Sequence, residues 1–309
     1  MSISIIVNQM IILFILIGTG YLLNKVHILG GQVDKQITRL ILFCTMPMMV
    51  LNSVLSNTGK RDYGSIITFS IISVIGYLAL PVLAFIFVKL IRVKKGLQGL
   101  YMFMFIFGNV GFMGFPVVSA LFGEDKVIYA GVVNIVFNLL AYSYGVYIMS
   151  LDGEGEETVK ISFKTFLTPG ISISAISLVL YFTGVNFPQV IKAPVAYLAN
   201  TTTPLAMLVI GSTLAGISMK EVFTDKKVYI FVALRFFVFP LLIYPLMKLL
   251  IKDEFILHFS FIMLIMPVAN SSVLYAKQYG SDEDMAAKAV FMSTLLSIVT
   301  IPLLFLICL

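Results

Sequence analysis

Ten long apolar runs set the limits on what this chain can fold into. Each is about 20 residues long, enough for a helix to cross a hydrocarbon core roughly 30 Å thick. Of the 309 residues, 60% are hydrophobic and only 12% are charged, whereas soluble domains average roughly 25% charged residues. The chain is therefore predicted to be an all-α membrane protein. The ten predicted spans are residues 3–23, 38–56, 64–88, 97–121, 127–150, 166–184, 194–217, 228–250, 255–277 and 285–308.

Lysine and arginine residues between the runs predict the orientation. The first run is expected to stay as a helix, because no basic residue precedes it and no small-residue cleavage site follows it. Basic residues concentrate in alternate loops, for example at Lys89, Arg92, Lys94 and Lys95, and are fewer in the others. Cytoplasmic loops hold the excess of Lys and Arg. The sequence therefore predicts a multi-pass protein of the cell (inner) membrane with both termini extracytoplasmic. The net charge of +6 is explained by these loops, and no soluble basic face for nucleic acid is expected.

The two halves of the sequence resemble each other at a nearly fixed offset. Pro47 matches Pro204 (204−47 = 157) and Pro81 matches Pro240 (240−81 = 159). Each half holds five spans, and an odd number turns the second copy over in the membrane, so the repeats are predicted to be inverted. The predicted boundaries are 1–150 for the first repeat, 151–165 for a cytoplasmic linker and 166–309 for the second repeat, within one transporter domain of residues 1–309.

Two of the apolar runs contain helix-breaking stretches. These are GNVGFMGFP (108–116) in the fourth run and PVANSS (267–272) in the ninth. Unwound backbone at membrane depth survives only where protein shields it or where it lines a cavity. Close helix packing at glycines and harmless proline kinks are the alternative, but each stretch also holds an amide, Asn109 or Asn270. Spans four and nine are therefore predicted to be broken and to cross at a binding site.

The chemistry of a broken helix favours a small anion. Its new N-terminus carries the positive end of a dipole, about half a charge, together with unpaired N–H groups. Asn134 and Asn138 lie one turn apart in the fifth span, where pairing between helices and contact with substrate are equally open. Arg235 lies inside the eighth span and could snorkel, attract an anion or pair with carbonyls of a broken helix. The candidate substrate-binding residues are Asn109, Gly111, Pro116, Asn134, Asn138, Arg235, Pro267, Asn270, Ser271 and Ser272.

Residue types that other functions need do not occur at membrane depth. Every Asp and Glu lies in a loop or at a span end, which disfavours an antiporter that carries its ion on a buried carboxylate. His27 and His258 are isolated, and Cys44 and Cys308 form no motif. The sequence therefore predicts no enzyme, no catalytic residue, no metal site and no cofactor.

Four motifs together carry a resemblance to a known family. Besides GNVGFMGFP they are TTTPLAMLVIGSTLA (201–215), LRFFVFP (234–240) and MPVANSSVLYAKQYGSD (266–282). With these the chain resembles the auxin efflux carrier family, whose bacterial members include malate-permease-like proteins, in the superfamily of bile acid and sodium/proton transporters. The resemblance implies a scaffold of spans one, two, six and seven and a moving transport part made of the other six.

The resemblance also implies roles for single residues. Asn109 and Pro116 match the asparagine and the crossover proline of the plant carriers, in which spans four and nine cross at the substrate site. The chain departs at Ser272, where those carriers tend to have a second proline, so Pro267 alone is left to set the break in the ninth span.

The expected function is a secondary transporter that exports small organic anions, malate-like or auxin-like carboxylates, by alternating access. Without an intramembrane carboxylate the simplest driving force is the membrane potential. Sodium-coupled symport with Asn109 and Asn270 as neutral ligands, proton coupling, and a non-transporting protein that only senses a ligand stay open as alternatives. The expected partners are the anion and the lipid bilayer, and a homodimer is left open.

Overall fold

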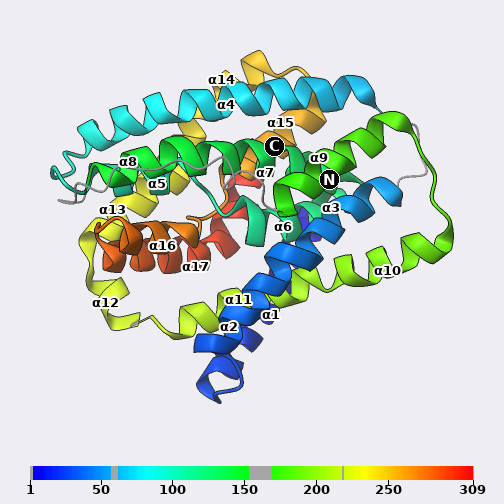
Figure 1. Ribbon diagram of the computed structural model, residues 1–309. Helices are drawn as coiled ribbons and strands as arrows, with labels where there is room; N and C mark the ends of the chain where they lie inside the picture. The colour runs from blue at the N-terminus through cyan, green and yellow to red at the C-terminus, as the bar shows by residue number, and fades with distance from the viewer. Residues whose placement is uncertain (1–2, 57–61, 153–168, 218, 309) are drawn as a thin grey trace. The chain divides into compact units, whose positions relative to one another are not determined.

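The computed structural model describes residues 3–56, 62–152, 169–217 and 219–308 (Figure 1). All regular elements in these ranges are helices, and the strand-like contact found there is a single bridge between Gly108 and Val268. The all-α prediction is confirmed for the described part of the chain. The predicted linker at 151–165 lies almost entirely outside the described residues.

Seven helices in the described ranges are long and apolar enough to cross a membrane, which confirms a multi-pass membrane protein. The other three predicted spans correspond to shorter apolar helices, Val110–Phe122, Ile171–Thr183 and Glu254–Leu264. The ten-span inverted repeat therefore stays a prediction. The seven long helices are Val7–Lys25, Gly31–Leu55, Tyr63–Leu90, Glu124–Ser150, Gln189–Ala215, Lys226–Leu250 and Glu283–Cys308.

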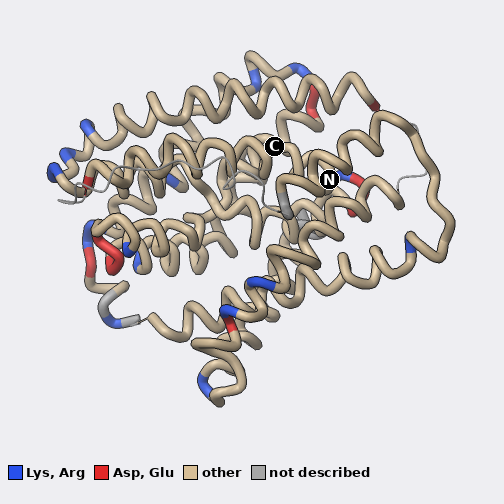
Figure 2. Tube along the Cα trace, viewed as in Figure 1, with Lys and Arg blue, Asp and Glu red and all other residues tan. Residues whose placement is uncertain are grey.

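The exposed side of α4 (Tyr63–Leu90) shows what a lipid-facing helix looks like in this chain. Ile75, Leu78 and Val82 follow one another at helical spacing, and each is about 60% exposed. The charged residue of α4 is Lys89 in its last turn, and charged residues elsewhere also gather near helix ends (Figure 2). Because an exposed apolar stripe of this length is unstable in water, lipid is its expected surrounding.

Contacts within the chain divide it into two compact units. Unit 1 comprises Met1–Ser70, Val110–Ile135 and Phe166–Gly216, and unit 2 comprises Ile71–Asn109, Val136–Thr165 and Ile217–Leu309. Helices α4 and α7 (Val127–Leu140) belong in part to each unit. The other helices of unit 1 are α1 (Ile3–Lys25), α2 (Gly31–Leu40), α3 (Met46–Leu55), α6 (Phe115–Phe122), α9 (Pro169–Thr183), α10 (Gln189–Asn200) and α11 (Thr202–Ala215). Those of unit 2 are α5 (Gln98–Ile106), α8 (Val146–Ser150), α12 (Met219–Thr224), α13 (Lys226–Ala233), α14 (Phe239–Leu250), α15 (Glu254–Leu264), α16 (Ser271–Gln278) and α17 (Glu283–Cys308).

Within unit 1, helices α1 and α11 pack side by side with their backbones in direct contact (Figure 1). A Cβ atom added at Gly211 would lie 1.9 Å from the Ile17 carbonyl oxygen, and one added at Gly20 would lie 2.1 Å from the Leu208 carbonyl oxygen. Small residues allow membrane helices to approach this closely. The α1–α11 pair is therefore fixed by glycine at both contact points.

Three prolines follow short π-helices, and the spacing has a physical cause. A proline inside a helix lacks an N–H, and its ring collides with the carbonyl four residues before it. In each case that fourth residue lies inside the π-helix, where the wider turn moves the carbonyl aside. The helix thus continues through the proline instead of breaking. The pairs are Ile41–Thr45 with Pro47, Val110–Gly114 with Pro116, and Leu234–Val238 with Pro240.

Candidate functional site

Two helices of the chain are interrupted in the stretches that the sequence indicated. The first interruption, Phe107–Asn109, lies between the end of α5 and the π-helix that leads into α6. The second, Ile265–Asn270, lies between α15 and α16 and contains Pro267. Pro116 lies seven residues beyond the first interruption, inside the helical segment Val110–Phe122. The interruption therefore lies before Pro116. The proline itself does not break the helix, because the preceding π-helix accommodates it.

Main-chain hydrogen bonds within unit 2 join the two interruptions, and we call this place the junction. The Asn109 N–H donates to the Pro267 carbonyl oxygen at 2.6 Å, and the Ala269 N–H donates to the Phe107 carbonyl oxygen at 3.1 Å. The bonds run in opposite directions between the two segments. Backbone groups that lost their helical partners thus find new ones, as unwound chain at membrane depth requires.

Gly108 and Ser293 make the close approach at the junction workable. A Cβ atom at Gly108 would lie 3.1 Å from the Met266 carbonyl oxygen, closer than a side chain is normally tolerated. The Val268 N–H donates to the Ser293 hydroxyl oxygen at 3.1 Å, and that hydroxyl donates to the Val290 carbonyl oxygen at 3.3 Å. Sequence reasoning missed this role of Ser293, because a helical serine can satisfy its hydroxyl on its own backbone.

Arg235 holds the C-terminal ends of the two helices that lead into the junction. The side chain is 1% exposed; its Nε donates to the Phe105 carbonyl oxygen at 2.7 Å, and its Nη2 donates to the Leu264 carbonyl oxygen at 3.1 Å. The rings of Phe105, Phe236 and Phe239 lie 5.0–5.3 Å from the guanidinium carbon. Of the roles left open by the sequence, pairing with carbonyls of a broken helix is the one observed. The positive charge offsets the negative ends of α5 and α15.

Asp152 performs the converse task at the N-terminus of α5. Its carboxylate oxygens accept hydrogen bonds from the Gly99 N–H at 2.8 Å and the Leu100 N–H at 2.7 Å. The Ser281 hydroxyl donates to the same carboxylate at 3.0 Å and ties in the turn before α17. Because α5 has only nine residues, a charge at each end stabilises a helix that is otherwise too short to be stable alone.

Helix α16 starts differently from four other helices of unit 2, α5, α13, α15 and α17. Acidic side chains stand at the N-termini of α13, α15 and α17, as Asp152 does for α5, whereas α16 has no acidic residue in its first turn. The hydroxyl groups of Ser271 and Ser272 at this end are buried and have no hydrogen-bond partner within the described part of the chain. The positive end of α16 is thus uncompensated and lined by two available donors.

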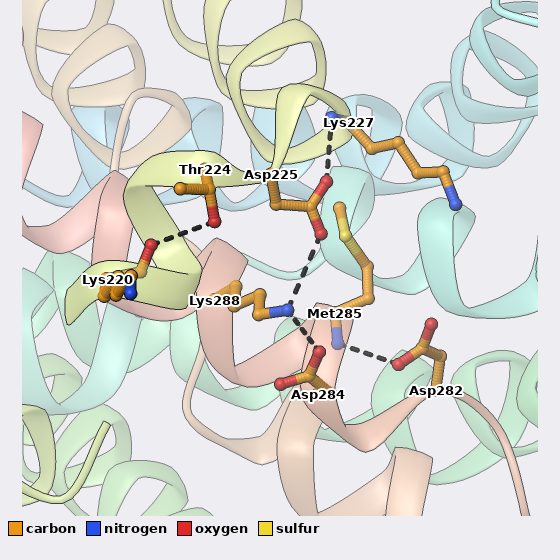
Figure 3. Close-up of polar contacts among 8 residues, drawn as sticks. All are labelled: Lys220, Thr224, Asp225, Lys227, Asp282, Asp284, Met285 and Lys288. Carbon is orange, nitrogen blue, oxygen red and sulfur yellow. Dashed lines mark hydrogen bonds and ion pairs between the residues drawn. The ribbon is translucent and has the colours of Figure 1, made fainter. Parts of the chain in front are cut away.

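A salt-bridge network in unit 2 fixes the start of α17 to the start of α13 (Figure 3). The Lys288 ammonium pairs with Asp284 one turn away and lies 3.7 Å from an oxygen of Asp225. Asp225 also accepts from the Lys227 N–H at 3.0 Å, and Asp282 accepts from the Met285 N–H at 2.8 Å. The Lys288 side chain is only 12% exposed, so this pair is shielded from solvent more than a typical surface pair.

The remaining predicted site residues divide between the two units. Gly111, Pro116 and Asn134 belong to unit 1, while Asn138 belongs to unit 2. Asn134 and Asn138 lie one turn apart on α7, the first buried and the second half-buried. The residues brought together within unit 2 at the junction or directly beside it are Asn109, Pro267, Asn270, Ser271 and Ser272, and Arg235 supports it from the adjoining helix ends.

Comparison with known proteins gives a consistent result along the chain. A family model described as membrane transport protein matches residues 5–305. An uncharacterized transporter of Methanocaldococcus jannaschii is 24% identical over 304 residues, covering 96% of each chain. An uncharacterized transporter of Methanothermobacter thermautotrophicus is 24% identical over 292 residues, covering 94% of each. A protein of Rhizobium meliloti, provisionally named a malonate transporter, is 22% identical over 201 residues, covering 63% of this chain and 62% of its own.

The relatives are named as transporters and not as enzymes, in agreement with the prediction that this chain is not an enzyme. The family match also confirms the resemblance to auxin efflux carriers that the four motifs carried. The chain belongs to the membrane transport protein family.

Proposed function

We propose that this membrane transporter exports small organic anions by alternating access and binds them at the junction. The observation that carries the proposal is the N-terminus of α16, which has a positive helix end, no acidic residue in its first turn and two buried serine hydroxyls available as donors. A carboxylate accepts hydrogen bonds from such groups and is favoured by the helix dipole. The relative named for malonate transport is consistent with a carboxylate substrate.

The charges around the junction support an anion over a cation or a neutral molecule. Arg235 already offsets the negative ends of α5 and α15, and Asp152 offsets the positive end of α5. The positive end of α16, by contrast, has no acidic residue in its first turn. A bound anion would complete this arrangement.

The proposed substrate-binding set keeps all the residues that the sequence indicated. Ser271 and Ser272 would donate hydroxyl hydrogen bonds, Asn109 and Asn270 would add amides, and Arg235 would act by holding the helix ends rather than by contact. The remaining members of the proposed set are Gly111, Pro116, Asn134, Asn138 and Pro267.

Replacing Ser271 and Ser272 together by alanine is expected to weaken malonate binding about a hundredfold or more, since each hydroxyl bonded to a charged ligand contributes roughly 1.5–3 kcal/mol. Folding should be unaffected, because neither hydroxyl has a partner to lose in the described structure. The measurement is the malonate-dependent rise in unfolding temperature of the purified protein. Ser260→Ala is the matched control, as it removes another buried, unpartnered hydroxyl, in α15. An equal malonate response in both variants would exclude α16 from the site.

The proposed driving force is the membrane potential. An anion leaving a negative-inside cell gains about 2.3 kcal/mol per charge per 100 mV. Proteoliposomes loaded with labelled malonate are therefore expected to release it faster when a potassium diffusion potential makes their interior negative. Flux that ignores the voltage and follows a proton or sodium gradient would replace uniport by ion coupling. Binding without any flux would point to a ligand sensor.

We further propose ten spans in two inverted repeats, with spans four and nine crossing at the junction and both termini extracytoplasmic in the cell membrane. Single cysteines placed at Lys94 and Lys252, with Cys44 and Cys308 replaced by alanine, test the orientation. In right-side-out vesicles an impermeant maleimide is expected to label position 252 at once and position 94 only after permeabilisation. The opposite pattern would invert the topology.

A further inference from the structure

Unit 1 contains a cavity of its own that the proposed transport site does not use. Its volume is about 300 Å³, at the lower end of the range for small-ligand sites. Six helical elements contribute to its wall, which is mostly polar in a chain that is 60% hydrophobic. The lining residues are Met49, Asn52, Ser119, Glu124, Val127, Ala199, Asn200 and Thr203.

The polar groups of this cavity suit a positively charged ligand. Its charged lining residue is Glu124, whose Oε2 accepts a hydrogen bond from the Asn52 Nδ2 at 3.1 Å. Asn52 is 5% exposed and so holds the carboxylate from a buried position. Ser119 and Thr203 add hydroxyl oxygens, and none of the described residues that line the cavity is Lys or Arg. An anion would meet the carboxylate without a compensating cation, whereas a cation finds several oxygen ligands.

Helix ends add to the negative potential of the cavity. Asn52 lies in the last turn of α3 and Ser119 in the last turn of α6, so two C-terminal dipole ends, each about half a negative charge, face the same space. The N-terminus of α7 directly follows the Glu124–Lys126 turn, and its positive end opposes one of these two contributions. At the α10–α11 boundary one helix ends as the next begins, and the two contributions cancel.

We propose that this cavity binds a monovalent cation, either an alkali metal ion or a small primary ammonium ion whose N–H groups donate to the oxygens of the lining. A single carboxylate neutralises only half the charge of a divalent ion and supplies few of the roughly six to eight oxygen ligands that Ca²⁺ takes, and Asp125 is already paired with Lys126 at 3.1 Å. The cavity is larger than a bare ion, so an alkali ion keeps part of its water shell and a small ammonium ion fits without one. Glu124 provides the charge, Ser119 and Thr203 provide neutral oxygens, and Asn52 positions the carboxylate.

The test compares cations at constant ionic strength. The unfolding temperature of the full chain in detergent is measured while choline chloride is replaced by sodium, potassium or methylammonium chloride. A saturable rise of roughly 2–4 °C with at least one small cation is expected, and which salt gives it separates alkali ions from ammonium compounds. No difference from choline with any of the three would overturn the proposal.

Two variants test whether the cation-dependent rise in unfolding temperature comes from this cavity. Glu124→Gln keeps the size of the side chain but removes its charge, and should abolish the rise; Ser119→Ala should shift it to higher cation concentration. The control Asp125→Asn removes a neighbouring carboxylate outside the lining and should retain it. A rise that persists unchanged in Glu124→Gln would place the cation elsewhere. The malonate response of the Ser271 and Ser272 variants is a separate readout, so either proposal can fail alone.

Discussion

Replacing Arg235 by methionine is expected to destabilise the protein by roughly 2–5 kcal/mol and to abolish transport. The substitution leaves the Phe105 and Leu264 carbonyl oxygens without their donor in a buried place, and each orphaned group costs about 1–3 kcal/mol. It also removes the positive charge that offsets the ends of α5 and α15. The measurement is the unfolding temperature together with malonate flux in proteoliposomes.

Two further variants serve as comparisons, Arg235→Lys as the conservative substitution and Arg39→Gln as the control. A lysine ammonium is a point charge that lacks the planar fork of arginine, so it is expected to keep one carbonyl contact and give an intermediate loss. Arg39 is exposed in the last turn of α2, and its replacement should change the unfolding temperature and the malonate flux little. A fully stable and active Arg235→Met variant would show that the carbonyls find other donors and that the charge is unimportant.

Gly211→Ala is expected to lower the yield of folded protein sharply, because the added Cβ atom would lie 1.9 Å from the Ile17 carbonyl oxygen. Relief requires α1 and α11 to move apart along their contact, which loses packing on both sides. A destabilisation of about 3 kcal/mol or more is expected, comparable with strong overpacking. Monodispersity in detergent and the unfolding temperature give the measurement.

Gly18→Ala is the matched control for that substitution. Gly18 lies on the same helix α1, and an added Cβ atom there meets nothing within 4 Å. Because alanine favours the helix over glycine by about 1 kcal/mol, this variant should be neutral or slightly stabilised. Equal behaviour of the two variants would mean that the α1–α11 contact does not limit stability.

The sequence predicted the helices well, because long apolar runs and prolines act locally. It also placed Asn109 and Pro267 correctly within the interrupted stretches. It did not place the first interruption at Phe107–Asn109, ahead of Pro116. That position depends on main-chain bonds to Pro267 and Ala269, which lie more than 150 residues away in the sequence. A local reading of glycine and proline spacing contains no information on such a partner.

Two other features were beyond the sequence for the same reason. Asp152 was placed in a loop, and its role at the N-terminus of α5 follows from folding back onto Gly99 and Leu100. The cavity beside Glu124 arises from segments spread between Met49 and Thr203. By contrast, pairing of Arg235 with helix-end carbonyls was foreseen as an option, because a cation inside a span needs acceptors nearby.

The junction is tied by peptide groups, through the Asn109–Pro267 and Ala269–Phe107 bonds. Peptide groups are the same for every amino acid, so this connection persists when most neighbouring side chains are exchanged. Side chains around the junction can therefore change while its main-chain hydrogen bonds are kept. The two archaeal relatives share about a quarter of their residues with this chain, and a frame made of peptide bonds is one that such divergence can leave intact.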